Sequence, residues 1–141
     1  MRSRFGAVMV IGVLAAGLVL AAPGVAGFKS GTYTGSSEQP DNNGVMLTVN
    51  KKRTKVNLVF FEWSATQIAP CGGGPGGTQW AGLTARIKPT GKFKVLSPAD
   101  GFYGYVKGKF NGRRAEGTAY YHFDKLGCDS GIVDWAAEKS S

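Results

Sequence analysis

Short apolar runs of period two, separated by turn-forming residues, limit what this chain can fold into. Val45, Leu47 and Val49 occupy alternate positions in one such run. Further runs lie at 27–35, 56–63, 80–88, 92–96, 102–110, 113–123 and 131–137. This period is typical of strands with one buried face, and strands that recur about every 8–12 residues are typical of a sandwich or a barrel. Because no stretch of about a dozen residues has a helical period, the pattern predicts an all-β domain of about eight strands.

An antiparallel β-sandwich of two sheets is the predicted architecture, with a closed up-and-down β-barrel as the alternative. Asn111 and Gly112 separate two alternating runs. An Asn-Gly pair in this setting predicts a hairpin in which both residues form the turn. Residues 51–54 predict a second hairpin turn, and residues 138–141 are expected to fray. Run 56–63 is apolar at both parities, which predicts a strand covered on both faces or one whose second face makes a contact.

The first 26 residues have the order of a secretory signal peptide. Arg2 and Arg4 precede an uncharged stretch, residues 5–22, and small residues lead up to Ala26. Cleavage is expected after Ala26, since Pro23 would obstruct it after Ala22. The alternative is a retained anchor, for which residues 5–22 are at the short end of the roughly 17–25 residues that span a bilayer. The prediction is a signal helix at 1–26, then one secreted or extracytoplasmic domain at 27–141 with no membrane span.

The expected mature chain is basic. Of the 17 Lys and Arg residues, Arg2 and Arg4 lie in the signal, so 15 basic minus 9 acidic residues leaves a net charge of +6. Its length suits a single core. The excess of positive charge favours contact with anionic surfaces and does not bear on the fold.

Cys71 and Cys128 are the only two cysteines. In the oxidising conditions that an exported protein meets, two cysteines predict one disulfide, worth on the order of 4 kcal/mol in the chain-entropy model. The alternatives are a metal pair or a reactive thiol. A metal site lacks ligands because His122 is the only histidine, so no metal or cofactor is expected.

Several short motifs follow one another along the chain. They are Gly31-Thr32-Tyr33-Thr34-Gly35, Cys71 before a glycine-rich loop, Gly91-Lys92-Phe93, Gly108-Lys109-Phe110-Asn111-Gly112, Gly117-Thr118, Cys128-Asp129-Ser130-Gly131 and Trp135-Ala136-Ala137. In this order they resemble a group of small exported bacterial proteins of unknown function. The resemblance spans most of residues 27–141 and implies a two-cysteine β domain. It implies no activity and no functional residues.

Candidate catalytic side chains are few. His122 would need a nucleophile such as Ser130 nearby, and no Gly-x-Ser-x-Gly elbow is present, so a surface histidine is favoured. A glycosidase needs two carboxyl groups about 5–10 Å apart in one cleft, for which Glu62 and Glu116 are the candidates. Glu116 follows Arg114 closely and is explained more simply as an ion-pair partner. The glycine-rich residues 72–77 lack the Lys-Ser/Thr pair of a phosphate-binding loop.

Binding candidates are basic or aromatic. The densest basic cluster consists of Lys51, Lys52, Arg53 and Lys55. It could bind an anionic envelope polymer, although a solvated hairpin tip that discourages edge pairing is the simpler interpretation. The aromatic residues are Trp63, Trp80, Tyr103, Tyr105, Tyr120 and Tyr121, of which Trp63, Trp80, Tyr120 and Tyr121 are the predicted ligand contacts. Adjacent Tyr120 and Tyr121 cannot both face inward, and an outward ring can stack on a sugar.

These observations favour an exported, non-enzymatic binding module for carbohydrate or an anionic cell-envelope polymer. A small hydrolase that uses Glu62 with Glu116, and an envelope structural protein that contacts other proteins, are the alternatives. Nucleic acid is excluded as the expected partner, since an exported chain seldom meets it and no recognition motif is present.

Overall fold

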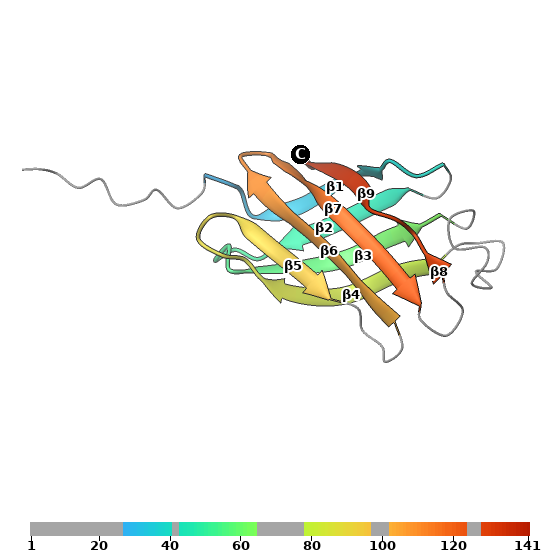
Figure 1. Cartoon of the computed structure of the whole chain (residues 1–141). Coiled ribbons are helices and arrows are strands. Elements are labelled where there is room, and N and C mark those ends of the chain that lie inside the picture. Colours follow the sequence, from blue (N-terminus) through green and yellow to red (C-terminus); the bar gives the residue numbers. More distant parts are fainter. Residues whose placement is uncertain (1–26, 41–42, 65–77, 97–101, 124–127) are drawn as a thin grey trace, which may run out of the picture.

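Nine β-strands make up the part of the chain that the computed structural model describes, namely residues 27–40, 43–64, 78–96, 102–123 and 128–141 (Figure 1). The strands are β1 (Gly31–Ser37), β2 (Gly44–Val49), β3 (Lys55–Trp63), β4 (Thr78–Arg86), β5 (Lys92–Leu96), β6 (Phe102–Asn111), β7 (Arg114–Phe123), β8 (Cys128–Asp129) and β9 (Val133–Lys139). Every pairing is antiparallel, which confirms the all-β prediction. Within these ranges there is no helix that could cross a membrane.

All the strands belong to one sheet, in the order β4-β3-β2-β1-β9-β7-β6-β5, with the short β8 pairing β7 beside this path. Most neighbours in the sheet are also neighbours in sequence. The exceptions are β7 with β9, which β8 separates in the sequence, and β1 with β9, which pair from Tyr33↔Lys139 to Ser37↔Trp135. The sheet curls until its two end strands, β4 and β5, approach each other, as Figure 1 shows. No ladder joins β4 to β5 among the described residues, so the barrel is nearly closed.

The predicted division into two sheets is wrong, and the up-and-down barrel is the closer alternative. Both architectures bury one face of every strand, so a period of two is the same in each. The pairing of β1 with β9 distinguishes them, because it joins the first and last strands into the same sheet.

Aromatic side chains fill the barrel. Trp63 packs against Trp80 and Tyr121, with ring centroids 5.3 and 5.7 Å apart. Phe110 packs against Phe93 and Tyr33, at 5.0 Å each. An interior of about eight strands is just wide enough to be filled by side chains, so these rings occupy a packed core.

Two inward glycines of β6 make room for two of the indoles. A Cβ added to Gly104 would lie 2.5 Å from Cη2 of Trp80, and one added to Gly108 would lie 2.6 Å from Cζ2 of Trp135. Small residues opposite large ones are how a narrow barrel accommodates its side chains. Gly108 is therefore required for space.

The predicted β6–β7 hairpin is confirmed, with its turn shifted by one residue. Asn111 pairs Arg114, so the two turn residues are Gly112 and Arg113, and only Gly112 has a positive φ, of 59°. A turn in which the first central residue alone needs positive φ suits glycine there. The register follows from the core: Phe110 pairs the buried Ala115, whereas a turn at 111–112 would pair Phe110 with Arg113.

A bulge explains why β3 is apolar at both parities. Met46 pairs Phe60 and Leu47 pairs Leu58, so Val59 is an extra residue in the ladder. An extra residue changes which parity faces inward. Val56 and Leu58 are buried before the bulge, as are Phe61 and Trp63 after it, while Val59 and Phe60 are half-buried. Both halves of the strand therefore contribute to one core, and the strand is not covered on both faces.

The C-terminal strand extends further than expected. β9 continues through Lys139, which pairs Tyr33, and the Ser140 backbone N–H donates to Thr32 O at 2.9 Å. The predicted fraying at 138–139 is wrong, because β1 supplies a partner strand from a part of the sequence far away. The predicted hairpin turn at 51–54 is confirmed by the pairing of Val49 with Val56.

We expect Gly108→Ala to destabilise the protein by about 1–3 kcal/mol, since the new methyl group overlaps Trp135 and the backbone O of Glu116. Urea unfolding measures the loss. Gly27→Ala is the control, because a Cβ there meets nothing within 4 Å. Equal urea midpoints of unfolding for the two variants would show that the fold does not depend on the absence of a side chain at Gly108.

Candidate functional site

Outward tyrosines form a row across β6 and β7, here called the tyrosine row: Tyr103, Tyr105 and Tyr120. The Tyr120 ring centroid is 6.1 Å from that of Tyr103 and 5.9 Å from that of Tyr105. His122 extends the row along β7, stacked on Tyr120 at 6.3 Å with an interplanar angle of 3°. These residues share one face because alternate residues of a strand point the same way.

Tyr103 is the most accessible ring of the row, with 58% of its surface exposed. Tyr105 and Tyr120 are half-buried. A surface tyrosine presents an apolar ring face and a polar hydroxyl, a combination that suits contact with a ligand having both kinds of group. The row therefore provides an open aromatic surface on the barrel wall.

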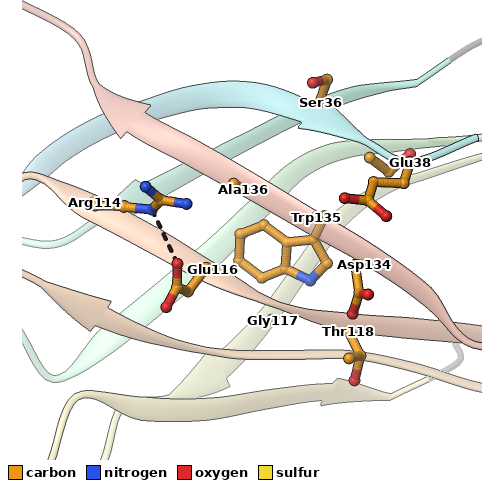
Figure 2. A pocket seen from close by; sticks show the side chains of 10 residues that line it. Ser36, Glu38, Arg114, Glu116, Gly117, Thr118, Asp134, Trp135 and Ala136 are labelled. Carbon is orange, nitrogen blue, oxygen red and sulfur yellow. Dashed lines mark ion pairs between the residues drawn. The ribbon is translucent and has the colours of Figure 1, made fainter.

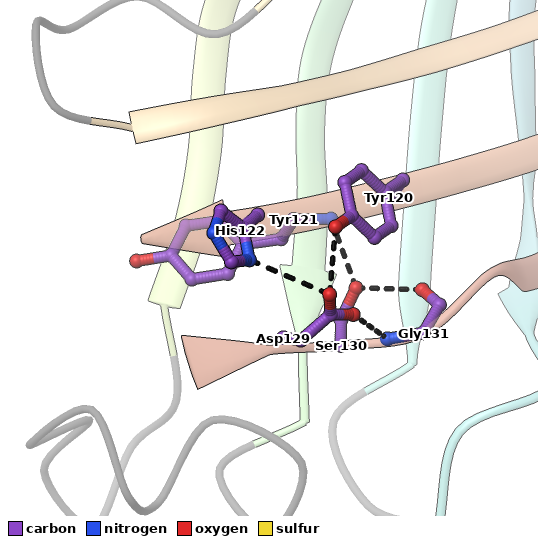
Figure 3. A network of polar contacts seen from close by, with 6 residues as sticks. All are labelled: Tyr120, Tyr121, His122, Asp129, Ser130 and Gly131. Carbon is purple, nitrogen blue, oxygen red and sulfur yellow. Dashed lines mark hydrogen bonds and ion pairs between the residues drawn. The ribbon is translucent and has the colours of Figure 1, made fainter. Parts of the chain in front are cut away.

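Asp129 on β8 holds the end of the row (Figure 3). The Tyr120 hydroxyl donates to Asp129 Oδ2 at 2.7 Å, and His122 Nδ1 lies 3.4 Å from the same oxygen. One carboxylate thus contacts both Tyr120 and His122 and fixes the orientation of the Tyr120 ring.

The turn after β8 places Asp129 there. The Gly131 N–H donates to Asp129 Oδ1 at 2.7 Å, and Gly131 has a φ of 65°, a conformation that L side chains rarely adopt. Ser130 is buried beneath this turn; its Oγ accepts from Tyr121 N–H at 2.9 Å and donates to Gly131 O at 2.8 Å. The Ser130 hydroxyl therefore uses its hydrogen bonds to hold the turn against β7. This argues against Ser130 as a nucleophile that His122 would activate.

The Tyr120–Asp129 hydrogen bond shifts the pKa values of both groups. The Asp129 carboxylate raises the pKa of Tyr120 to about 12. In turn, the hydrogen bonds from Tyr120 and from Gly131 N–H lower the pKa of Asp129. The raised Tyr120 pKa means that the bond is fully present below about pH 10 and is lost as the pH rises through about 12. At the acid end, the lowered pKa means that it is lost as the pH falls through the folded-state pKa of Asp129.

Lysines flank the row on the β5 side. Lys94 Nζ and Lys107 Nζ lie 5.0 and 4.8 Å from the centroid of the Tyr105 ring. An ammonium at such a distance over an aromatic face is attracted by the ring quadrupole. Positive charge is therefore fixed directly beside the open rings.

A shallow groove crosses the outer face over β1, β9 and β7 (Figure 2). Its volume is about 510 Å³, and its polar lining includes Glu38, Glu116, Thr118 and Asp134. Glu116 Oε2 accepts from Arg114 Nε at 2.9 Å, so one of the carboxylates is already paired. Nowhere in the described part do three or more His, Cys, Asp or Glu residues gather as metal ligands.

The two carboxylates of the hydrolase alternative do not come together. Glu62 lies on β3 and Glu116 on β7, with β2, β1 and β9 between these strands. Glu62 Oε2 accepts from the Gly44 N–H at 2.8 Å, and Glu116 is held by Arg114. Each has a local structural partner.

Three of the four predicted ligand contacts belong to the core. Trp63, Trp80 and Tyr121 are 0%, 5% and 4% exposed, and Tyr120 alone faces outward. Lys51, Lys52, Arg53 and Lys55 are exposed at the β2–β3 hairpin, as predicted for a hairpin tip. Cys71 lies outside the described residues and Cys128 begins β8, so the disulfide remains a prediction.

Sequence reasoning missed the roles of Asp129, Lys94 and Lys107. The outward direction of Tyr103 and Tyr105 could have been predicted from alternation. Val106 and Phe110 have the inward parity of β6, and the two tyrosines have the opposite parity. Asp129 had no such signal, because its position depends on β8 pairing with the end of β7.

Comparisons with protein-family models, with curated proteins and with solved structures found no match to this chain.

We expect Asp129→Asn to lower the Tyr120 pKa from about 12 toward its ordinary value of about 10, because the carboxylate that disfavours the phenolate is removed. The measurement is an ultraviolet titration of phenolate absorbance. The curve of the wild type minus that of Tyr120→Phe gives the titration of Tyr120 alone. For the Asp129→Asn variant, the curve of the double variant Asp129→Asn/Tyr120→Phe is subtracted in the same way. An unchanged Tyr120 midpoint would contradict the assigned hydrogen bond.

Proposed function

We propose that this protein is an exported, non-enzymatic binding module that binds a carbohydrate or cell-envelope polymer through the tyrosine row. The observation that carries the proposal is the accessible Tyr103 ring next to Tyr105 and Tyr120, all on one wall of the barrel. Sugar rings have apolar faces edged with hydroxyls, and a tyrosine offers a matching apolar face with a polar tip.

The rigidity of the row supports this role. Tyr120 is tied to Asp129 at 2.7 Å and stacked on His122, and Tyr105 lies beneath two ammonium groups. Side chains that are already ordered lose less conformational entropy when a ligand binds. A strand-borne row is also positioned more firmly than one on a loop.

Binding is favoured over hydrolysis because the candidate carboxylates lie on strands separated by three others. Binding is also favoured over a purely structural envelope role, because one exposed large hydrophobic residue, Tyr103, belongs to the ordered tyrosine row. The exposed large hydrophobic residues of the described part are Leu96, Tyr103 and Ile132. The proposal includes export by the signal at 1–26 and a disulfide between Cys71 and Cys128, both expected from the sequence.

The test is binding of the protein to a panel of polysaccharides. We expect Tyr103→Ala and Tyr120→Ala each to weaken binding by about 2- to 10-fold, the effect of losing one stacking contact of about 0.5–1.5 kcal/mol. Phe60→Ala is the matched control, since it removes a half-buried ring from the opposite wall, on β3. Failure of the wild type to bind any polysaccharide, or equal losses in all three variants, would refute the proposal.

A further inference from the structure

Four lysines face outward on β5 and β6 and form what we call the lysine quartet: Lys92, Lys94, Lys107 and Lys109. Lys92 pairs Lys109 and Lys94 pairs Lys107 in the ladder. All four are exposed. Directly opposed residues of an antiparallel pair have their Cβ atoms about 4.5–5.5 Å apart, so like charges repel across both pairs.

No lysine of the quartet makes an ion pair with a carboxylate of the described part. The ion pairs there are Arg114 with Glu116 and His122 with Asp129. Glu116 pairs Lys109 across β6 and β7, but its carboxylate is held by Arg114 at 2.9 Å. The quartet is therefore a concentration of positive charge whose repulsion an external anion would relieve.

A recess lies among these lysines. Lys92, Lys107 and Lys109 line it together with Phe93, Thr118 and the Arg114-paired Glu116, and its volume is about 440 Å³. The backbones of Gly108 and Gly117 also line it, and both residues occupy inward positions of their strands. Bulky groups of a ligand can thus lie low between the ammonium groups.

The quartet is continuous with the tyrosine row. Lys94 and Lys107, two of its members, are the lysines within 5.0 Å of the Tyr105 centroid. Aromatic rings and paired charges therefore adjoin on the outer face of two neighbouring strands.

We infer that the ligand is an acidic polysaccharide, a linear polymer whose sugars carry carboxylate or sulfate groups; this inference rests on the proposed function. Its anionic groups bind the lysine quartet while its ring faces stack on Tyr103 and Tyr120. Two rows of lysines along extended strands suit a linear chain of anions, and the adjoining rings suit the sugars between them. The charge complementarity selects acidic over neutral glycans.

This assignment moves the polyanion contact away from the β2–β3 hairpin. Lys51, Lys52, Arg53 and Lys55 are as numerous, but no ring of the described part has a cation–π contact with any of them. Arg53 Nη1 donates to Phe28 O at 3.3 Å, which gives that side chain a local partner. The hairpin therefore offers charge without a surface for sugar rings.

The experiment compares polygalacturonate with its fully methyl-esterified form, which keeps the sugar backbone and lacks the charges. One variant carries Lys92→Gln, Lys94→Gln, Lys107→Gln and Lys109→Gln. The matched control carries Lys51→Gln, Lys52→Gln, Arg53→Gln and Lys55→Gln and loses the same charge. Polyphosphate and phosphatidylglycerol vesicles serve as anionic probes without sugar rings. Thermal unfolding checks each variant, and if the quadruple variant fails to fold, Lys94→Gln/Lys107→Gln replaces it.

We expect the wild type to bind polygalacturonate at least about tenfold more tightly than the ester at low salt, and the quartet variant to lose most of this preference while the hairpin variant keeps it. Tyr103→Ala should weaken binding to both forms. Equal binding of acid and ester by the wild type would overturn the acidic ligand and leave the glycan proposal intact. Equal loss in both quadruple variants, or binding of polyphosphate or vesicles as tight as that of polygalacturonate, would overturn the acidic-glycan site. Binding to neither glycan would overturn the acidic-glycan inference, and only the absence of binding to the whole polysaccharide panel would refute the proposed function.

Discussion

The packing of large rings into a narrow barrel is the constraint on which the rest of this structure depends. Trp80 and Trp135 fit only because Gly104 and Gly108 of β6 present no side chain to them. Their burial, with that of Trp63, Phe110 and Tyr33, supplies the apolar contact that brings the curled sheet together. A ladder between β4 and β5 is lacking in the described part, so the core and the β1–β9 ladder maintain the barrel shape.

The same packing creates the outer surface. Val106 and Phe110 of β6 and Ala119 and Tyr121 of β7 are buried, so the positions that alternate with them must face outward. Tyr105 and Tyr120 are therefore on the outside as a consequence of the core. The single carboxylate of Asp129 then orders the row, and it reaches Tyr120 because the Ser130–Gly131 turn directs β8 along β7.

Charge on the barrel wall is arranged unevenly. Lysines oppose lysines on β5 and β6, which costs stability, whereas Arg114 and Glu116 on the neighbouring β7 neutralise each other. The two glutamates considered for hydrolysis are both engaged in local contacts, Glu62 with the Gly44 backbone and Glu116 with Arg114. Uncompensated charge together with open rings is thus found at one region, and both features suit binding better than catalysis.

The sequence by itself determined the antiparallel β content, the β6–β7 hairpin and the outward placement of one of Tyr120 and Tyr121, because these depend on local alternation and turn chemistry. Only the tertiary structure decided that β1 pairs β9, that Trp63 and Trp80 are core residues and that Lys94, Lys107 and Asp129 surround the tyrosine row. Alternation specifies two faces for each strand, and it does not specify which strands become neighbours. A bulge at Val59 can also exchange the faces within one strand. A surface assembled from several strands depends on both, so it becomes visible only when the sheet has closed.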